Sequence, residues 1–226
     1  MPPSLQFPGV HHITFLEGLL AENVQFDRDI IPSQNDVDFV RGAVMLSDMN
    51  SWCIGTVGPH NFGLKWYVGR ARPEEVAYKL KTSQINPDYV PDELLEAISD
   101  LHFSTPEEFT AYEEGCPVHP AWPAMHSAAS AGSLWMPLVM KLSHAQWCEA
   151  KAVDYGIAYA RTVAGVHYPT DNIAGLMVGQ EILARKLPWY LSQRYGSDPV
   201  KVKEKVESLR FDWRLYLKSD CFPRTQ

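Results

Sequence analysis

The chain has 226 residues, of which 46% are hydrophobic and 21% are charged, a balance typical of globular proteins. Its formal net charge of −7 argues against general binding to nucleic acid or to an anionic membrane surface. A small anion site built from a few cationic side chains remains compatible with this charge.

The start of the chain, MPPSLQFPGVHH, shows no secretory signal, because no basic segment precedes an apolar one. The segment 1–36 could also begin at a truncated boundary, which would leave the N-terminal part incomplete. The longest uncharged run, 116–140, contains four prolines and two histidines, which a lipid-facing helix would not choose. We therefore expect a soluble protein with no membrane span.

Four cysteines, Cys53, Cys116, Cys148 and Cys221, lie far apart in the chain. They form no C-x-x-C pair and no His/Cys cluster of zinc-ligand spacing. We therefore expect buried or free thiols rather than a disulfide framework or a metal site, a usage compatible with the cytoplasm.

Helical spacing of apolar residues and helix-start signals run through most of the chain, without a competing alternating strand pattern. The run Gly55–Pro59 predicts a break between the first two helices, and Pro137 predicts a kink in a later one. Gly175 and Gly179 would give one helix a thin face for close packing. In chain order, the expected helices cover 36–54 and 62–70, begin near 72, 91 and 104, and then cover 127–142, 145–164, 169–186 and 197–217.

These patterns predict one all-α domain over residues 1–226, a helical bundle whose motif-bearing core lies at about 60–190. The aromatic and small-residue surfaces also permit association into a homo-oligomer.

The stretch 119–130, HPAWPAMHSAAS, holds a histidine at the junction of a loop and a helix. Prolines stiffen the loop before His126, and the small residues after it suit a helix that something approaches closely. Taken alone, His126 is more often a hydrogen-bonded structural residue than a catalyst.

A second cluster of polar residues follows near the start of a later helix. Arg161 sits among apolar residues and needs an anionic partner if it is buried, for which Glu149 or Asp154 would suffice. His167 lies just before a helix start, where anions are favoured. Asp171 lies four residues further on and can orient the His167 imidazole.

Three cations earlier in the chain complete the set. Lys65, Arg70 and Arg72 could by themselves form a solvated helix face. Together with Arg161 they would supply donors for a tetrahedral or trigonal-bipyramidal oxyanion. A histidine such as His126 at the mouth of that site is suited to proton transfer near neutral pH.

The spacing K-x6-R-P, then P-x-x-H, then R-x5-H-x3-D resembles the signature of the type 2 phosphatidic acid phosphatase and vanadium-dependent haloperoxidase superfamily. The loop P-x-H-P-x-aromatic-P over 117–123, with a K-W start and an R-P-E finish to the first element, resembles the haloperoxidase branch. The positions that carry the resemblance are Lys65 with Arg72 and Pro73, Pro123 with His126, and Arg161 with His167 and Asp171.

The resemblance implies the helical bundle of the soluble acid phosphatase and haloperoxidase type. It also implies a vanadate cofactor, for which phosphate competes, and the oxidation of bromide or iodide by hydrogen peroxide to a hypohalous-acid equivalent. His119 and Trp122 lie where halide preference would be tuned.

Individual roles follow by position from the same resemblance. His167 would be the axial ligand of vanadate, with Asp171 as its orienting partner, and His126 would be the acid/base. The oxyanion clamp would consist of Lys65, Arg72, Arg161 and the Met125 amide, with Lys65 also polarising bound peroxide.

The second motif departs from the family pattern at two residues, and Ala160 stands where a serine often precedes the arginine of the third motif. Ala124 and Met125 stand where the family usually has serine and glycine, so one hydroxyl donor to the oxyanion is missing. Ser127 could replace it only if its side chain points inward. Two alternatives therefore stay open: a soluble acid phosphatase with a phospho-histidine at His167, and a non-catalytic, anion-binding descendant.

Overall fold

The computed structural model describes residues 18, 22, 24–33, 39–111 and 117–222. The fold is all-α, as the sequence predicts, and the only β pairing in the described part is an isolated bridge between Phe26 and Met140. The cysteine Cys116 and most of the segment 1–36 lie outside the described residues. The helices are α2 (Phe39–Val68), α3 (Pro73–Lys81), α4 (Asp92–Ser99), α5 (Pro106–Phe109), α6 (Met125–Ala129), α7 (Gly132–Val139), α8 (His144–Val163), α9 (Pro169–Tyr195) and α10 (Pro199–Ser208), with the 3-10 turns η2 (Pro87–Tyr89) and η3 (Trp213–Lys218).

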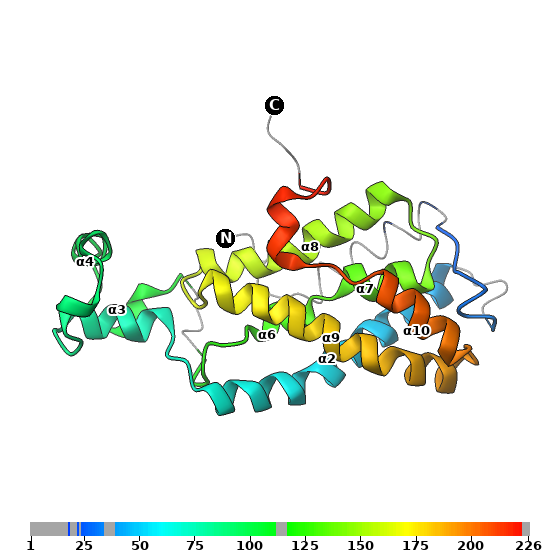
Figure 1. The fold of residues 1–226 in the computed structure, drawn as a ribbon, viewed down its shortest axis with the longest axis horizontal. Helices are drawn as coiled ribbons and strands as arrows, with labels where there is room; N and C mark the ends of the chain where they lie inside the picture. The colour runs from blue at the N-terminus through cyan, green and yellow to red at the C-terminus, as the bar shows by residue number, and fades with distance from the viewer. Residues whose placement is uncertain (1–17, 19–21, 23, 34–38, 112–116, 223–226) are drawn as a thin grey trace.

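The long helices α2 and α9 run side by side along the molecule, and α8 lies on the other side of α9 (Figure 1). Trp52 stacks on Tyr190 at one end of the α2–α9 pair, with ring centroids 3.8 Å apart. Arg70, just after α2, bonds to Asp171 in the first turn of α9. The two helices are therefore antiparallel, and α3 and α4 project beyond the end that carries Arg70 (Figure 1).

The predicted break at Gly55–Pro59 is wrong, because α2 is one unbroken helix of 30 residues that includes Pro59. A buried stripe with a spacing of four residues crosses the expected break and holds the helix against the core. Tertiary burial thus outweighs the local cost of glycine and proline. The stripe is apolar at first and polar at its end: Met49, Cys53, Val57, Asn61 and Lys65.

The thin face predicted on α9 is confirmed. A Cβ atom added at Gly175 would lie 2.4 Å from the carbonyl oxygen of Ala124, and one at Gly179 would lie 2.0 Å from that of Ala128. Only glycine allows α6 to approach α9 this closely. The two glycines therefore set the position of the helix that carries His126.

The single helix predicted over 127–142 is two helices, α6 and α7, separated at Ser130 and Ala131. The buried carboxylate of Asp154 accepts hydrogen bonds from the amides of Gly132 (3.1 Å) and Ser133 (2.9 Å) at the start of α7. This cap satisfies amides that a new helix start leaves without partners. Sequence periodicity cannot reveal it, because the carboxylate comes from α8.

Two other helix ends differ from the prediction. Helix α9 continues past 186 to Tyr195 and ends at Gly196, whose φ of 71° suits glycine. The last predicted helix, 197–217, ends at Ser208, and η3 follows after a short turn. The helix expected at 145–164 is confirmed as α8, which a Ser143–Gln146 capping box begins.

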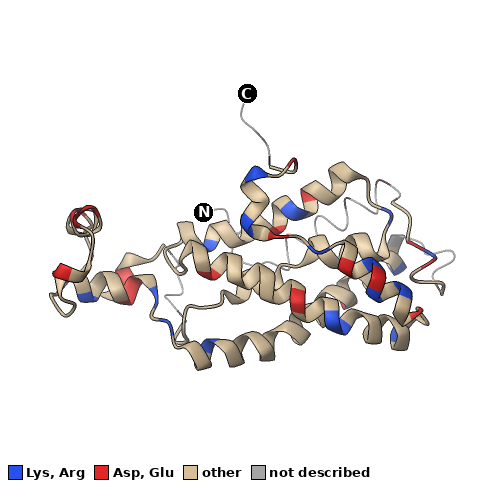
Figure 2. Cartoon of the chain, viewed as in Figure 1, with Lys and Arg blue, Asp and Glu red and all other residues tan. Residues whose placement is uncertain are grey.

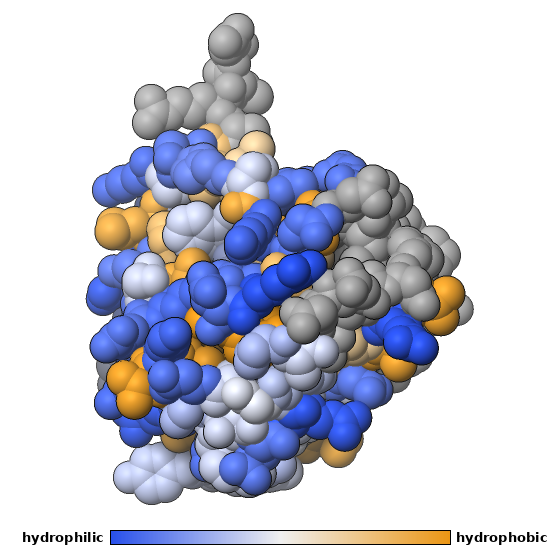
Figure 3. Space-filling model, turned by 90° about the vertical axis from the view of Figure 1, so that its right-hand side faces the viewer, coloured by the Kyte–Doolittle hydropathy of each residue, from blue (hydrophilic) through white to orange (hydrophobic). Residues whose placement is uncertain are grey.

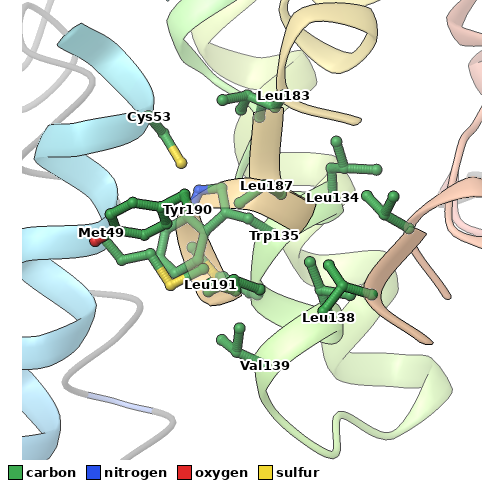
Figure 4. Packing of buried hydrophobic residues seen from close by; sticks show 14 of the residues in the cluster. Met49, Cys53, Leu134, Trp135, Leu138, Val139, Leu183, Leu187, Tyr190 and Leu191 are labelled. Atoms are coloured by element: carbon green, nitrogen blue, oxygen red, sulfur yellow. The ribbon is translucent and has the colours of Figure 1, made fainter. Parts of the chain in front are cut away.

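The main hydrophobic core lies between α2, α7, α9 and α10, away from the polar end of α2. Figure 4 shows Met49 and Cys53 of α2, Trp135 of α7 and Tyr190 of α9 meeting in this core. Fully burying a side chain such as Leu187 contributes roughly 1.5–3 kcal/mol. This core makes α2 and α9 a rigid frame for the residues at their other ends.

The expectation of free thiols is wrong for two cysteines and confirmed for a third. Cys148 on α8 and Cys221 after η3 form a disulfide across 73 residues of sequence, whereas Cys53 is free and buried. The pairing arises because η3 folds back onto α8 and α9 around Ala158 and Leu176. The cysteine-based argument for a reducing compartment therefore no longer holds.

Charged side chains of both signs are distributed over the molecule, and α4 carries only acidic ones (Figure 2). The end face that Figure 3 shows is mainly hydrophilic, with hydrophobic groups in small separate areas. Within the described ranges, no helix has the length and apolar composition needed to cross a membrane.

Candidate functional site: a buried cationic pocket

Lys65 is the last member of the buried stripe of α2 and is fully buried. Its Nζ atom donates hydrogen bonds of 2.9 Å to the carbonyl oxygens of Pro120 and Ala121. Burial, followed by the positive charge of Arg72, lowers the pKa of Lys65 to about 7. The Lys65 ammonium therefore holds the loop around Pro120 and Ala121, and its pKa lies close to neutral pH.

The loop 117–124 is held on both sides by backbone contacts. Asn61 donates from its side chain to the carbonyl oxygen of Pro123 (3.2 Å), and the amide of Ala121 donates to the carbonyl oxygen of Arg70 (2.8 Å). The amide of Ala124 donates to the carbonyl oxygen of Asp171 (3.0 Å). These contacts tie the predicted stiff loop to α2 and α9 together.

Arg72 is buried and holds the same loop from the other side. Its Nε donates to the carbonyl oxygen of His119, and its Nη1 donates to that of Val166, both at 2.8 Å. Its Nη2 lies 3.0 Å from Nδ1 of His119. A guanidinium only donates, so this contact needs Nδ1 to accept, whereas the Pro120 carbonyl oxygen, 3.3 Å from the same Nδ1, needs it to carry the proton.

His119 is half-buried beside Arg72. Burial lowers its pKa, and the ring of Phe62 packs edge-on against it at 5.0 Å between centroids. Trp122, the other predicted halide-tuning residue, is also half-buried in the loop. The structure thus places His119 against the cationic residues, next to an aromatic ring.

His167 is buried between α8 and α9, and its Nδ1 lies 3.4 Å from Oδ2 of Asp171. Burial is the main cause that lowers the pKa of His167 to about 4, with Arg72 and Lys65 acting in the same direction and Asp171 opposing them. The ring is therefore neutral at pH 7. With its proton on Nδ1 toward Asp171, Nε2 keeps a free electron pair.

Asp171 is fully buried and has more partners than the sequence predicts. Its Oδ2 accepts a hydrogen bond of 3.0 Å from the Tyr168 amide at the start of α9. Its Oδ1 accepts one of 2.6 Å from Nη1 of Arg70, which also donates to Oγ1 of Thr170 (2.9 Å). The Cζ atom of Arg70 lies 4.1 Å from the centre of the Tyr168 ring. These contacts hold the carboxylate in place for His167.

The structure places Arg70 in the site, whereas the sequence shows it only as one of three nearby cations. Its role depends on the meeting of the ends of α2 and α9, which lie 101 residues apart. The preceding Gly69, with a φ of 66°, ends α2 and turns the chain. In the sequence, the only local sign of this role is a helix-ending glycine next to an arginine, and this sign does not reveal that Asp171 is the partner of Arg70.

His126 lies in the first turn of α6. Burial lowers its pKa to about 3, and four cationic or titratable groups add to the effect in the order Arg161, His167, Lys65 and Arg72. This coupling shows that the predicted residues share one electrostatic environment, although they come from four segments of the chain. The imidazole of His126 is neutral at pH 7.

Arg161, in the last turn of α8, is 3% exposed. The carboxylate of Asp154, which the sequence offers as a structural partner, binds the two amides at the start of α7. After burial, the positive charge of Arg161 is the largest cause of the lowered pKa of His126. Its position therefore agrees with a place in the predicted clamp.

Ser127 does not replace the missing hydroxyl. Its Oγ donates a hydrogen bond of 2.9 Å to Oδ1 of Asn172, and Nδ2 of Asn172 donates one of 2.8 Å to Oγ1 of Thr162. This buried chain of hydrogen bonds links α6, α9 and α8. Met125 is half-buried and packs against the main core, with its terminal methyl close to Gly58 of α2.

The pocket is suited to a small, doubly charged oxyanion. Three buried cations, Lys65, Arg72 and Arg161, lie close enough to His126 to lower its pKa, and His126 and His167 are both neutral at pH 7. Phosphate and vanadate both match this set of donors in charge and shape, but the side chain of Ala124 offers no hydroxyl to either. The positive charge of the site would therefore attract an oxyanion, and position 124 offers one donor fewer than the family pattern has.

A cavity of about 400 Å³ lies on the outer side of Arg72 and His119. Its wall includes the carboxylates of Glu74, Glu75 and Glu107, which would repel an anion. The same wall includes Arg70 and Arg72, so the cavity carries charges of both signs.

The family model described as the PAP2 superfamily matches residues 49–194, more than half of the chain. No curated protein and no solved structure matches the chain. The matched range contains every one of the predicted site residues.

Proposed function

Because the chain belongs to the PAP2 superfamily, we propose that it is a vanadate-dependent haloperoxidase that oxidises bromide or iodide with hydrogen peroxide. The observation that carries the proposal is the pairing of two neutral histidines, His126 and His167, with three buried cations. One histidine would supply the nitrogen ligand of vanadate, an anionic Lewis acid, and the other would accept a proton. The cations would balance the charge of the cofactor.

His167 is the proposed ligand. Its Nε2 offers an electron pair without first losing a proton, because the pKa of about 4 keeps the ring neutral. Asp171 and Arg70 hold the ring in the required orientation. Vanadate, when bound there, would supply the Lewis acidity that activates peroxide.

The cations have two tasks. Arg72 and Arg161 offset the charge of the anion, and the Met125 amide at the start of α6 adds a neutral donor. Lys65 uses two of its three protons on the loop carbonyls, so one remains for an oxygen of the bound anion or of peroxide. Donation from Lys65 would draw electron density from that oxygen and favour attack by halide.

His126 is the proposed proton carrier. Its neutral imidazole can accept a proton from incoming hydrogen peroxide and later return it to the departing oxygen as water. The net reaction is H₂O₂ + Br⁻ + H⁺ → HOBr + H₂O, in which bromide is oxidised and peroxide is reduced. His119, next to Arg72 and Phe62, is proposed to influence which halide reacts.

A soluble acid phosphatase is the second candidate, and the neutral Nε2 of His167 favours it because that atom could attack a phosphomonoester. However, a phosphatase needs His126 protonated to assist the leaving group. The pKa of about 3 opposes this until a bound anion raises it. Bound vanadate would raise the pKa of His126 in the same way, so its protonation state does not separate the two candidates.

The test compares two activities of the purified full chain. One sample is reconstituted with vanadate and assayed for bromination and iodination of a phenolic acceptor by hydrogen peroxide. A parallel sample without vanadate is assayed for hydrolysis of a generic phosphomonoester. His167→Ala serves in both assays to show that the activity comes from this pocket.

Halogenation that requires vanadate and His167, without hydrolysis, supports the peroxidase. Hydrolysis without halogenation supports the phosphatase. If both activities are absent and neither phosphate nor vanadate binds, the chain fits a descendant in which Ala124 and Met125 mark lost chemistry.

A further inference from the structure

A second group of ligand-type side chains lies at the opposite end of α8 from Arg161, about 25 Å away along the helix. His144 and Cys148 come from the first turns of α8, and Asp220 and Cys221 follow η3. We propose that this group binds one zinc ion when the Cys148–Cys221 disulfide is reduced. The site is separate from the oxyanion pocket and does not depend on the proposed activity.

The spacing of the ligand atoms supports one ion. One potential ligand atom from each of the four residues lies within 4.8 Å of the others. The ring nitrogens of His144 lie 3.8 and 3.9 Å from Sγ of Cys148, and its Nε2 lies 3.2 Å from Oδ2 of Asp220. Ligand atoms around a tetrahedral zinc ion are about 3.4–3.8 Å apart, so these three are already close to their places.

The position of the four residues in the chain also supports the site. His144 and Cys148 are four residues apart on one helix and therefore share a face. Asp220 and Cys221 are neighbours on the segment that packs over that face. Two pairs of ligands from two segments close the coordination shell, as in structural zinc sites.

Charge favours a doubly positive ion. Two thiolates and one carboxylate give three negative charges, which zinc reduces to one. Lys151 is 4% exposed, and its Nζ lies 3.8 Å from Sγ of Cys221 and 3.4 Å from the centre of the Trp147 ring. The Lys151 ammonium would offset the remaining charge and donate to a ligating sulfur.

The chemical steps balance with a dithiol as reductant. The dithiol transfers two electrons to the disulfide, becomes a cyclic disulfide itself and leaves Cys148 and Cys221 as thiols. Zinc then displaces one proton from each thiol and forms two Zn–S bonds. Thiolate and imidazole ligands favour zinc over calcium or magnesium, which prefer oxygen.

The oxidised and the zinc-bound forms would make the same connection by different means. Each ties the start of α8 to the segment after η3, beside the buried residues Trp213 and Tyr216. Metal binding could therefore preserve this corner of the fold under reducing conditions.

Cobalt substitution tests the proposal on the full chain. The reduced, metal-free protein is titrated with cobalt(II), and thiolate-to-metal absorption bands are recorded; zinc is then added to displace the cobalt. We expect about one cobalt per chain, tetrahedral bands that zinc removes, and no such bands in the oxidised protein. Cys148→Ser should lower the intensity of the thiolate bands by about half, because one of the two thiolate ligands is lost, and His144→Ala should weaken cobalt binding at least tenfold.

Cys53→Ser and His102→Ala are the matched controls, since Cys53 is a free buried thiol and His102 an exposed histidine away from this corner. Both should bind cobalt as the unmodified chain does. A measurement that needs no variant is alkylation: zinc should slow the labelling of Cys148 and Cys221 in the reduced chain at least tenfold. Thiolate bands of unchanged intensity in Cys148→Ser, or a reduced chain without bands and without protection by zinc, would overturn the proposal.

Discussion

Arg70 and Asp171 form an ion pair of 2.6 Å that joins the end of α2 to the start of α9. Asp171 is fully buried, and its second oxygen faces His167. The pair therefore supports His167, the proposed ligand or nucleophile, and we expect it to hold the orientation of that ring. Such supporting contacts commonly affect ligand affinity by 10–100-fold.

Arg70→Gln should weaken vanadate and phosphate binding by about tenfold, near the low end of that range because the Arg70 side chain is 38% exposed. The reason is that Asp171 would keep its bond to the Tyr168 amide but lose its charged partner. Isothermal titration with each anion measures the effect. Arg185→Gln, which removes an exposed arginine from an ion pair on the surface of α9, is the control and should change nothing. Equal affinities for both variants would contradict the role of Arg70.

Binding of sulfate, whose own charge does not change near neutral pH, should weaken as the pH rises above about 7. In the free protein the pKa of Lys65 is lowered to about 7, so its positive charge is lost above that value. A bound anion favours the protonated form, and affinity should fall up to tenfold per pH unit until the bound state also loses the proton. Titrations from pH 6 to 9 measure the slope. Lys65→Met should bind weakly with a nearly flat profile, and an equally steep profile in that variant would exclude Lys65 as the cause.

The free protein should lose stability as the pH falls from about 6.5 to 4. Burial lowers the pKa of His126 to about 3 and that of His167 to about 4, whereas both histidines bind protons near pH 6.5 when the chain is unfolded. The unfolded chain then holds more protons, so each histidine reduces the free energy of unfolding by at most about 1.4 kcal/mol per pH unit. Urea unfolding at several pH values measures this. His126→Gln should flatten the dependence, and a saturating oxyanion should do the same by raising both pKa values.

Ala124→Ser should tighten the binding of vanadate. The change restores a hydroxyl at the position where the family has one, and a hydrogen bond to a charged group contributes roughly 1.5–3 kcal/mol, or about ten- to a hundredfold in affinity. Equilibrium titration of vanadate measures it. Ser127→Ala is the matched control, because that hydroxyl is already bonded to Asn172 and should not influence the anion directly. Unchanged or weaker binding in Ala124→Ser would show that residue 124 does not line the pocket.

Gly179→Ala should lower the free energy of unfolding by at least about 2 kcal/mol, since its Cβ would lie 2.0 Å from a backbone oxygen of α6. Gly156→Ala is the control, because nothing lies within 4 Å of a Cβ there, on the exposed side of α8. That change should be neutral or stabilise the protein by up to about 1 kcal/mol. Chemical denaturation of the two variants gives the comparison. Similar losses of unfolding free energy in both variants would mean that the packing of α6 on α9 does not depend on the close contact at Gly179.

The sequence by itself determined the relationships that act within a few residues. The thin face at Gly175 and Gly179 could be predicted because a helix repeats every 3.6 residues. The contact of His167 with Asp171 and most helix starts could be predicted from the residues that begin a helix. The three motifs also pointed to one anion site.

Only the tertiary structure decided the relationships between distant segments. Helix α2 passes through Pro59 because a buried stripe holds it, and α7 begins where Asp154 of α8 caps it. The Arg70–Asp171 pair and the Cys148–Cys221 disulfide likewise join residues 101 and 73 positions apart. No local pattern encodes such pairs, because the packing of buried faces, rather than sequence spacing, selects which side chains meet.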